Sequence, residues 1–165
     1  MSIKLIVSAF PILFLLVSFI TIEAATVTQV SVGSKHSAYL KDDGTLWVMG
    51  KNDFGQLGDG TQINRISSPV KIASGVIALG SGDFNTFYLL GDGSLMAVGN
   101  NQYGQLGDGT TKDRNSSVLI DSAVSSVSAG ASQMFYIKSD GTLWATGRNN
   151  YGQLGDGTVT DRKSP

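Results

Sequence analysis

The stretch GKNDFGQLGDG at residues 50–60 returns as GNNQYGQLGDG at 99–109 and as GRNNYGQLGDG at 147–157. The heptapeptide GQLGDGT is identical in every copy, and its starts at positions 55, 104 and 152 lie 49 and 48 residues apart. A fixed period of this size is typical of proteins that stack one supersecondary unit repeatedly. Beyond its N-terminal segment, the chain is therefore expected to consist of three repeats: residues 27–75, residues 76–123, and an incomplete third at 124–165.

Each repeat also contains an Asp-Gly pair between two short runs of aromatic and aliphatic residues. In the first repeat, SAYLK (37–41) precedes Asp43-Gly44 and TLWVMG (45–50) follows it. This pattern predicts a β-hairpin with a type I′ turn, in which both central residues need positive φ. Apolar residues face both ways in LWVM (46–49), which predicts a strand buried on both sides.

Further short strands are expected around each hairpin, for example Val30–Val32 before the first hairpin and Pro69–Ala73 after the first heptapeptide. No stretch of the repeats shows helical periodicity. Four-stranded sheets that recur every 40 to 50 residues or so, each covered by its neighbours, describe propeller blades. We therefore predict an all-β fold with about three β-propeller blades, each of four antiparallel strands.

The three long copies resemble the signature G-x-N-x-x-G-Q-L-G-x-G of the regulator of chromosome condensation repeat family. A second signature of that family, G-x-x-H-S, is matched once, by GSKHS at residues 33–37. The resemblance implies a β-propeller of the seven-bladed type. Three repeats are too few to close such a ring, and an open end exposes strand edges. We interpret the chain as truncated, either as a fragment or by an early stop, with self-association that completes the ring as the alternative.

The N-terminal segment has the layout of a secretory signal peptide. Lys4 is the only charge before an apolar run from Leu5 to Ile22, and small residues follow the run. We predict cleavage after Ala24, so that residues 1–24 are removed and the protein is secreted or periplasmic, without membrane contact. An uncleaved membrane anchor is the less favoured alternative, because the run approaches the ~20 residues that span a bilayer.

The composition argues against several classes of function. A net charge of −1 lacks the basic footprint of a nucleic-acid-binding protein, so no nucleic-acid partner is expected. The absence of cysteine rules out disulfides and thiolate metal sites. Glu23 is the only glutamate, so the acidic residues of the repeats are all aspartates, which together with glycine favour turns.

The heptapeptide is either a ligand loop or a structural joint. A phosphate-binding loop needs a Lys and then Ser or Thr after its last glycine, but here Thr61 follows Gly60 directly. A calcium loop needs alternating carboxylates, but each copy has only one aspartate. We therefore predict no cofactor and no metal, and a joint in which glycines bend the chain and a leucine fills the space between blades. The residues of this structural motif are Gly55, Leu57, Gly58, Gly60, Gly104, Leu106, Gly107, Gly109, Gly152, Leu154, Gly155 and Gly157.

His36 is the only histidine, and Asn85 and Gln133 take its place in the other repeats. Asn and Gln can replace His as hydrogen-bonding groups but not as proton carriers, so we predict a structural role for His36. Without cysteine or a second histidine the usual catalytic triads and zinc sites cannot be built, and no enzyme is expected.

Three arginines, Arg65, Arg114 and Arg162, also recur in register. We predict that each pairs within its own blade, with the aspartate of the heptapeptide as the partner. The alternative is a ring of guanidinium groups on one face that binds an acidic partner.

Recognition is expected where the repeats differ, at loop positions on the rims of the propeller. Phe84 is the one apolar side chain at an expected loop tip and is therefore a candidate anchor for a protein partner. The alternative is that these are solvated loop residues without a partner. The candidate partner-binding residues are Lys35, Lys51, Phe84, Asn100 and Arg148.

We predict a non-enzymatic, exported protein-interaction module that binds an unidentified protein through its rim loops. The resembled family implies two alternatives. One is guanine-nucleotide exchange on a small GTPase, and the other is inhibition of an enzyme of the β-lactamase type by a secreted propeller.

Overall fold

The computed structural model describes residues 25–165, which form eleven strands and no helix. The predicted signal peptide, residues 1–24, lies outside this part of the chain. None of the described residues belongs to a helix with the length and apolarity needed to cross a membrane.

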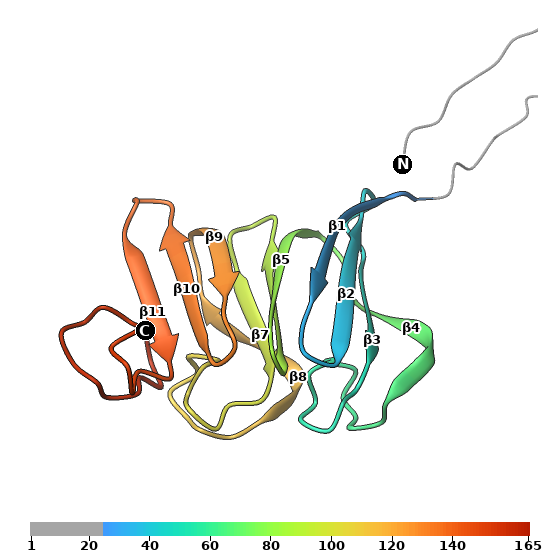
Figure 1. Cartoon of the computed structure of the whole chain (residues 1–165). Coiled ribbons are helices and arrows are strands. Elements are labelled where there is room, and N and C mark those ends of the chain that lie inside the picture. The colour runs from blue at the N-terminus through green and yellow to red at the C-terminus, as the bar shows by residue number, and fades with distance from the viewer. Residues whose placement is uncertain (1–24) are drawn as a thin grey trace, which may run out of the picture.

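The strands form three antiparallel sheets that follow one another in chain order (Figure 1). The first sheet contains β1 (Val27–Val32), β2 (His36–Lys41), β3 (Leu46–Gly50) and β4 (Arg65–Ala73). The second contains β5 (Val76–Gly82), β6 (Asn85–Leu90), β7 (Leu95–Gly99) and β8 (Arg114–Asp121). The third contains β9 (Val124–Ala129), β10 (Gln133–Lys138) and β11 (Leu143–Gly147).

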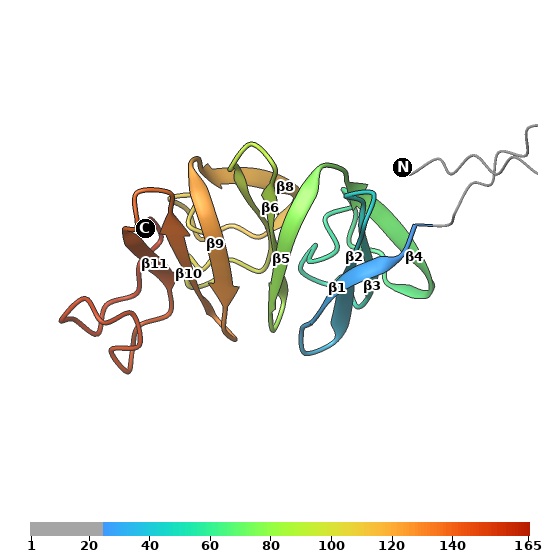
Figure 2. The same ribbon diagram turned by 90° about the horizontal axis from the view of Figure 1, so that it is seen from above.

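The sheets stand side by side as blades, and the view from above shows all three in a row (Figure 2). Their first strands are neighbours, with β1 in contact with β5 and β5 in contact with β9. The prediction of all-β propeller blades is therefore confirmed, and the first two blades have four strands each. The third sheet has three strands, and Arg162 adds only an isolated bridge to Gly147.

The hairpin turns differ from the predicted type I′. In the first, the Gly44 N–H donates to the Lys41 carbonyl at 3.0 Å and the Lys41 N–H donates to the Thr45 carbonyl at 3.0 Å. Gly44 has a φ of 74°, but Ala123 is the only described non-glycine residue with a positive φ. The loop is therefore a three-residue type I turn that ends in a left-handed glycine. The type I′ prediction was wrong because Asp43 is not left-handed; its side chain instead accepts the Thr45 N–H at 2.9 Å.

The core lies between the blades. Leu46 and Val48 of β3 are fully buried in a cluster that includes Tyr88 from the next blade. The other face of β3 is only partly covered, and there Trp47 stacks on Tyr39 with ring centroids 6.4 Å apart. The predicted burial of this strand on both sides therefore holds for the face toward the next blade and only in part for the other.

The first two heptapeptides lie between neighbouring blades. Leu57 and Leu106 are fully buried, each in a separate cluster between two blades. The three glycines of each heptapeptide all have positive φ, from 68° to 82°. At Gly55 a side chain would also lie 2.5 Å from the Cα of Asn115 in the next blade, so this position needs glycine for the bend and for the close approach.

Candidate functional site

The loops that differ between repeats meet at one edge of the blades, the lower edge in Figure 1. Neighbouring turns on this edge are bonded in series. The Ser34 N–H donates to the Asp83 carbonyl at 3.0 Å, and the Asp83 N–H donates to the Ala131 carbonyl at 3.3 Å. We call this edge the turn rim. It consists of turns 33–35, 83–84 and 130–132 together with the loops that follow β3, β7 and β11.

The structure brings the five sequence-predicted residues together on the turn rim. The Lys51 N–H donates to the Lys35 carbonyl at 2.8 Å, and the Asn100 N–H donates to the Phe84 carbonyl at 2.9 Å. In the third blade the Arg148 N–H donates to the Ser132 carbonyl at 2.8 Å. Each loop is thus tied to the turn of its own blade, and the variable side chains stand on a shared backbone framework.

Two aromatic contacts bridge neighbouring blades on the turn rim. Phe84 of the second blade packs on Phe54 of the first, with ring centroids 5.2 Å apart. The Arg148 guanidinium of the third blade lies 4.9 Å from the ring centroid of Tyr103 in the second. Tyr151 holds the position of Phe54 and Tyr103 in the third repeat and is 85% exposed. The sequence analysis missed these rings, although an aromatic residue stands directly before every heptapeptide.

The candidate residues differ in how accessible they are. Lys35 is exposed, and Lys51 is half-buried and forms an ion pair with Asp53. Asn100 departs from the expectation for a partner-binding residue, because it is buried. Its Oδ1 accepts a hydrogen bond from Gln105 Nε2 at 2.7 Å, so its side chain organises the loop from within. Four of the five candidates therefore remain available on the rim.

A set of buried asparagines holds the loops in shape, and the sequence analysis gave them no role. In the second blade, Asn101 Oδ1 accepts the Leu106 N–H at 3.0 Å. Its Nδ2 donates to Asp108 Oδ1 at 2.9 Å and to the Thr110 carbonyl at 3.1 Å. Their identity in every copy, three residues before the heptapeptide, was the available signal. The set is Asn52, Asn101 and Asn149, all of which are 0% exposed.

The predicted pairing of the repeated arginines is confirmed. Arg65 donates to Asp59 Oδ2 through Nε at 2.9 Å and through Nη2 at 2.8 Å, and Thr61 donates to Oδ1 of the same carboxylate. Burial alone would raise the pKa of Asp59, but the hydrogen bonds from Thr61 and Arg65 hold the pKa below its usual value. The carboxylate is therefore charged and already bonded within its loop. The equivalent pairs are Arg114–Asp108 and Arg162–Asp156.

His36 has the structural position predicted for it, buried between two blades. Its Nε2 lies 3.1 Å from Thr86 Oγ1, and that hydroxyl donates to the Gln56 carbonyl at 2.8 Å. Because the single hydroxyl proton goes to Gln56, the His36 Nε2 must be the donor. Burial lowers the pKa of His36, although nearby backbone groups of Asn85 and Asp83 offset part of this effect. Within residues 25–165 no group of three or more His, Asp or Glu side chains is placed to hold a metal.

These features define a class of protein: a repeat protein built from propeller blades, with a heptapeptide joint that is identical in every repeat and with variable residues on one rim. The profile of the Regulator of chromosome condensation (RCC1) repeat matches residues 27–56, 76–105 and 124–153, and a second profile of that description matches 43–89 and 92–137. The chain belongs to this family. No curated protein sequence matches it at a significant level.

Three solved structures share the fold. Human WBSCR16 superposes with a TM-score of 0.75 at 22% identity, over 86% of this chain and 39% of that one. Prp20p from Saccharomyces cerevisiae gives a TM-score of 0.68 at 21% identity, over 83% of this chain and 34% of that one. Yeast RCC1 (Prp20) in complex with Kap60 gives 0.66 at 22% identity, over 79% and 32%. The chain thus spans between 32 and 39% of the length of these proteins.

Proposed function

We propose that the chain is a protein-interaction module that holds a protein partner on its turn rim. The observation that carries this proposal is a continuous, hydrogen-bonded edge on which variable side chains stand on a repeated framework. Phe84 and Arg148 are each packed on an aromatic ring from the neighbouring blade, so a partner that covers them costs little side-chain entropy. Aromatic and arginine side chains are also the types that dominate protein interfaces.

Charged residues accompany these contacts. Lys35 and Asp83 are exposed on adjacent turns, and Lys51 pairs with Asp53 at the start of the loop after β3. A partly apolar surface with charges of both signs around it is typical of transient protein–protein interfaces. The turn rim therefore fits a protein partner better than a small molecule, which needs a concave pocket.

The fold relatives support a protein partner in general terms. Prp20p is described by its binding to Gsp1p and histones, and it also forms a complex with Kap60. The present chain spans 34% of Prp20p, so we take from it only that propellers of this family bind proteins.

We further propose that the module is non-enzymatic and exported. The only histidine is buried between blades, and the heptapeptide carboxylates are bonded within their own loops. Export rests on the apolar run from Leu5 to Ile22 and the small residues after it. Guanine-nucleotide exchange and inhibition of a β-lactamase remain hypotheses based on family resemblance, because no contact on the turn rim favours either one.

Affinity capture with matched variants tests the proposal. Residues 25–165 are immobilised and exposed to the extracellular and periplasmic proteins of the producing cells. The rim variant carries Lys35→Glu and Phe84→Ala. The control carries Lys71→Glu and Ile77→Ala, one charge reversal and one truncation of an apolar side chain, at two exposed strand positions outside the turn rim. Circular dichroism verifies that both variants fold.

The expected result is at least one protein that the wild type and the control retain and that the rim variant loses by about tenfold or more. Equal capture by the rim variant and the wild type would argue against the turn rim as the binding surface. If the chain accelerated nucleotide release from a small GTPase, the assignment would move to the exchange-factor alternative.

A further inference from the structure

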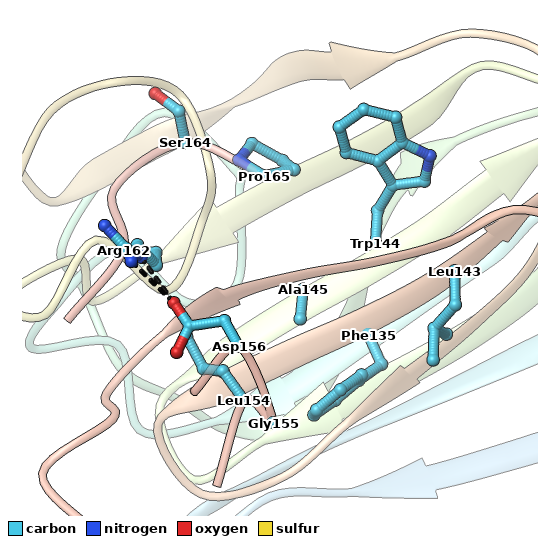
Figure 3. Close-up of a pocket in the computed structure, with 10 residues that line it drawn as sticks. All are labelled: Phe135, Leu143, Trp144, Ala145, Leu154, Gly155, Asp156, Arg162, Ser164 and Pro165. Atoms are coloured by element: carbon cyan, nitrogen blue, oxygen red, sulfur yellow. Dashed lines mark hydrogen bonds and ion pairs between the residues drawn. The ribbon is translucent and has the colours of Figure 1, made fainter. Parts of the chain in front are cut away.

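The arginines of the chain show which groups of this fold hold a guanidinium. Arg162 donates to Asp156 Oδ2 through Nε at 2.7 Å, and Figure 3 shows these two side chains joined by dashed lines. Arg148 lies instead over the Tyr103 ring, 4.9 Å from its centroid. A carboxylate and an aromatic face both suit the planar, delocalised charge of arginine. All four arginines of the chain use one of these two groups, since heptapeptide aspartates also pair with Arg65 and Arg114.

The boundary between the first and second blades offers both kinds of group at one place on the turn rim. Phe54 and Phe84 pack on each other with ring centroids 5.2 Å apart, and both are partly exposed. An exposed aspartate stands directly before each ring in the chain, Asp53 before Phe54 and Asp83 before Phe84. The first boundary is therefore both aromatic and acidic.

The boundary between the second and third blades is built differently. The residues in the equivalent places are Gln102, Tyr103, Ala131 and Ser132, which supply one ring and no carboxylate. Arg148 of the chain itself covers that ring. At the first boundary Asn100 holds the place of Arg148, and its side chain is turned into its own loop by the hydrogen bond from Gln105. The first boundary therefore receives no guanidinium from the chain.

Asp83 is the carboxylate of the first boundary that lacks a cation. Asp53 forms an ion pair with Lys51. No lysine or arginine among residues 25–165 forms an ion pair with the Asp83 carboxylate, although Lys35 is exposed on the neighbouring turn. An exposed carboxylate next to a partly exposed ring is thus available to a positive group from outside the chain.

We propose that Asp83 and Phe84 bind an arginine side chain of the protein partner. The guanidinium stacks on the exposed part of the Phe84 ring and pairs with the Asp83 carboxylate, so that it uses together the two groups that the chain's own arginines use separately. Arginine fits better than lysine, because its planar fork can stack and pair at the same time. This inference rests on the proposed function and names the chemistry that the partner presents to the turn rim.

An NMR titration of the isotopically labelled protein tests the inference. The probe is the capped peptide acetyl-Gly-Arg-Gly-amide, and the matched probe contains citrulline, which has the shape of arginine without its charge. Backbone amide shifts at Asp83 and Phe84 report binding. The variants Asp83→Asn and Phe84→Leu each remove one of the two groups. The control Asp92→Asn makes the same charge change in the exposed turn at the other end of β6, and circular dichroism verifies that all variants fold.

The wild type and Asp92→Asn should bind the arginine peptide equally, with a dissociation constant in the millimolar range. Asp83→Asn and Phe84→Leu should each weaken binding by about threefold or more. The citrulline peptide should shift neither amide. Equal shifts from the two peptides, or an affinity that either variant leaves unchanged, would overturn the proposal.

Affinity capture separates this inference from the proposed function. A protein that the turn rim captures should also be retained less by Asp83→Asn, and should be retained fully by Asp92→Asn. Capture that Asp83→Asn leaves intact, with no binding of the arginine peptide, would overturn arginine recognition while the interaction module stands. Failure of the wild type to capture any protein would instead count against the module itself.

Discussion

The joint between blades makes a quantitative prediction about two glycines with the same sequence context. Gly55 and Gly152 open identical heptapeptides and have φ values of 77° and 71°. A Cβ at Gly55 would lie 2.5 Å from the Asn115 Cα and 2.8 Å from the Arg114 carbonyl oxygen. A Cβ at Gly152 would lie 3.7 Å from its nearest neighbour, the Thr158 carbonyl oxygen. Alanine therefore meets the same backbone strain at both positions but collides with main chain only at Gly55.

The expected losses of unfolding free energy follow from these two effects. A left-handed φ costs a non-glycine residue ~1–2 kcal/mol, which applies to Gly55→Ala and Gly152→Ala alike. Forcing an extra carbon into a filled interface adds ~1–3 kcal/mol, and this applies to Gly55→Ala alone. We therefore expect a loss of ~1–2 kcal/mol for Gly152→Ala and of ~2–5 kcal/mol for Gly55→Ala. Both figures are before the smaller unfolded-state entropy of alanine, which offsets each by a similar ~0.4–1 kcal/mol and leaves the difference between the two variants unchanged.

Urea denaturation followed by circular dichroism measures both losses. The difference between the variants isolates the close approach of one blade to the next. Equal losses at the two positions would show that the heptapeptide glycine serves only the bend, and the account of the heptapeptide as an interblade joint would be refuted.

Three further predictions concern the loops and the single histidine. Burial lowers the pKa of His36 in the folded chain, while its pKa in the unfolded chain stays near 6.5. The unfolding free energy is therefore expected to fall as the pH drops from about 7 to 5. The variant His36→Asn, which places at this position the residue found at Asn85, should flatten this pH dependence in urea denaturation measured over a series of pH values. The aspartates with lowered pKa reduce the unfolding free energy in a separate pH range, below about pH 4, where they become protonated. Replacing the buried Asn101 by alanine should lower the unfolding free energy by ~2–4 kcal/mol, because it leaves N–H and carbonyl groups of the loop unpaired. The control Gln102→Ala, at an exposed neighbouring position, should change the urea midpoint little. Calcium and a chelator should leave the melting temperature within about 1 °C of the untreated value, since loop donors occupy the heptapeptide carboxylates; a clear rise with calcium would contradict that assignment.

The turn rim was predictable only in part. Position-by-position comparison of the repeats identified Lys35, Phe84 and Arg148 as variable, and all three lie on this edge. Asn100 is variable too, but its amide points into its own loop, because Gln105 reaches back to it. Variation between repeats marks loop positions, and it does not say whether a loop side chain faces solvent or the loop interior.

Features confined to one repeat could be read directly from the amino-acid sequence, because they arise from neighbouring residues. The period, the number of strands in a complete blade and the Arg65–Asp59 pair all come from segments that are close together in the chain. Apart from the leucine of the heptapeptide, the residues that meet across blades could not be read in this way. Phe54 meets Phe84, and His36 meets Thr86 at a separation of 50 residues, because whole sheets pack face to face and their turns bond in series. No local pattern encodes that packing, so the continuous rim was visible only in the folded chain.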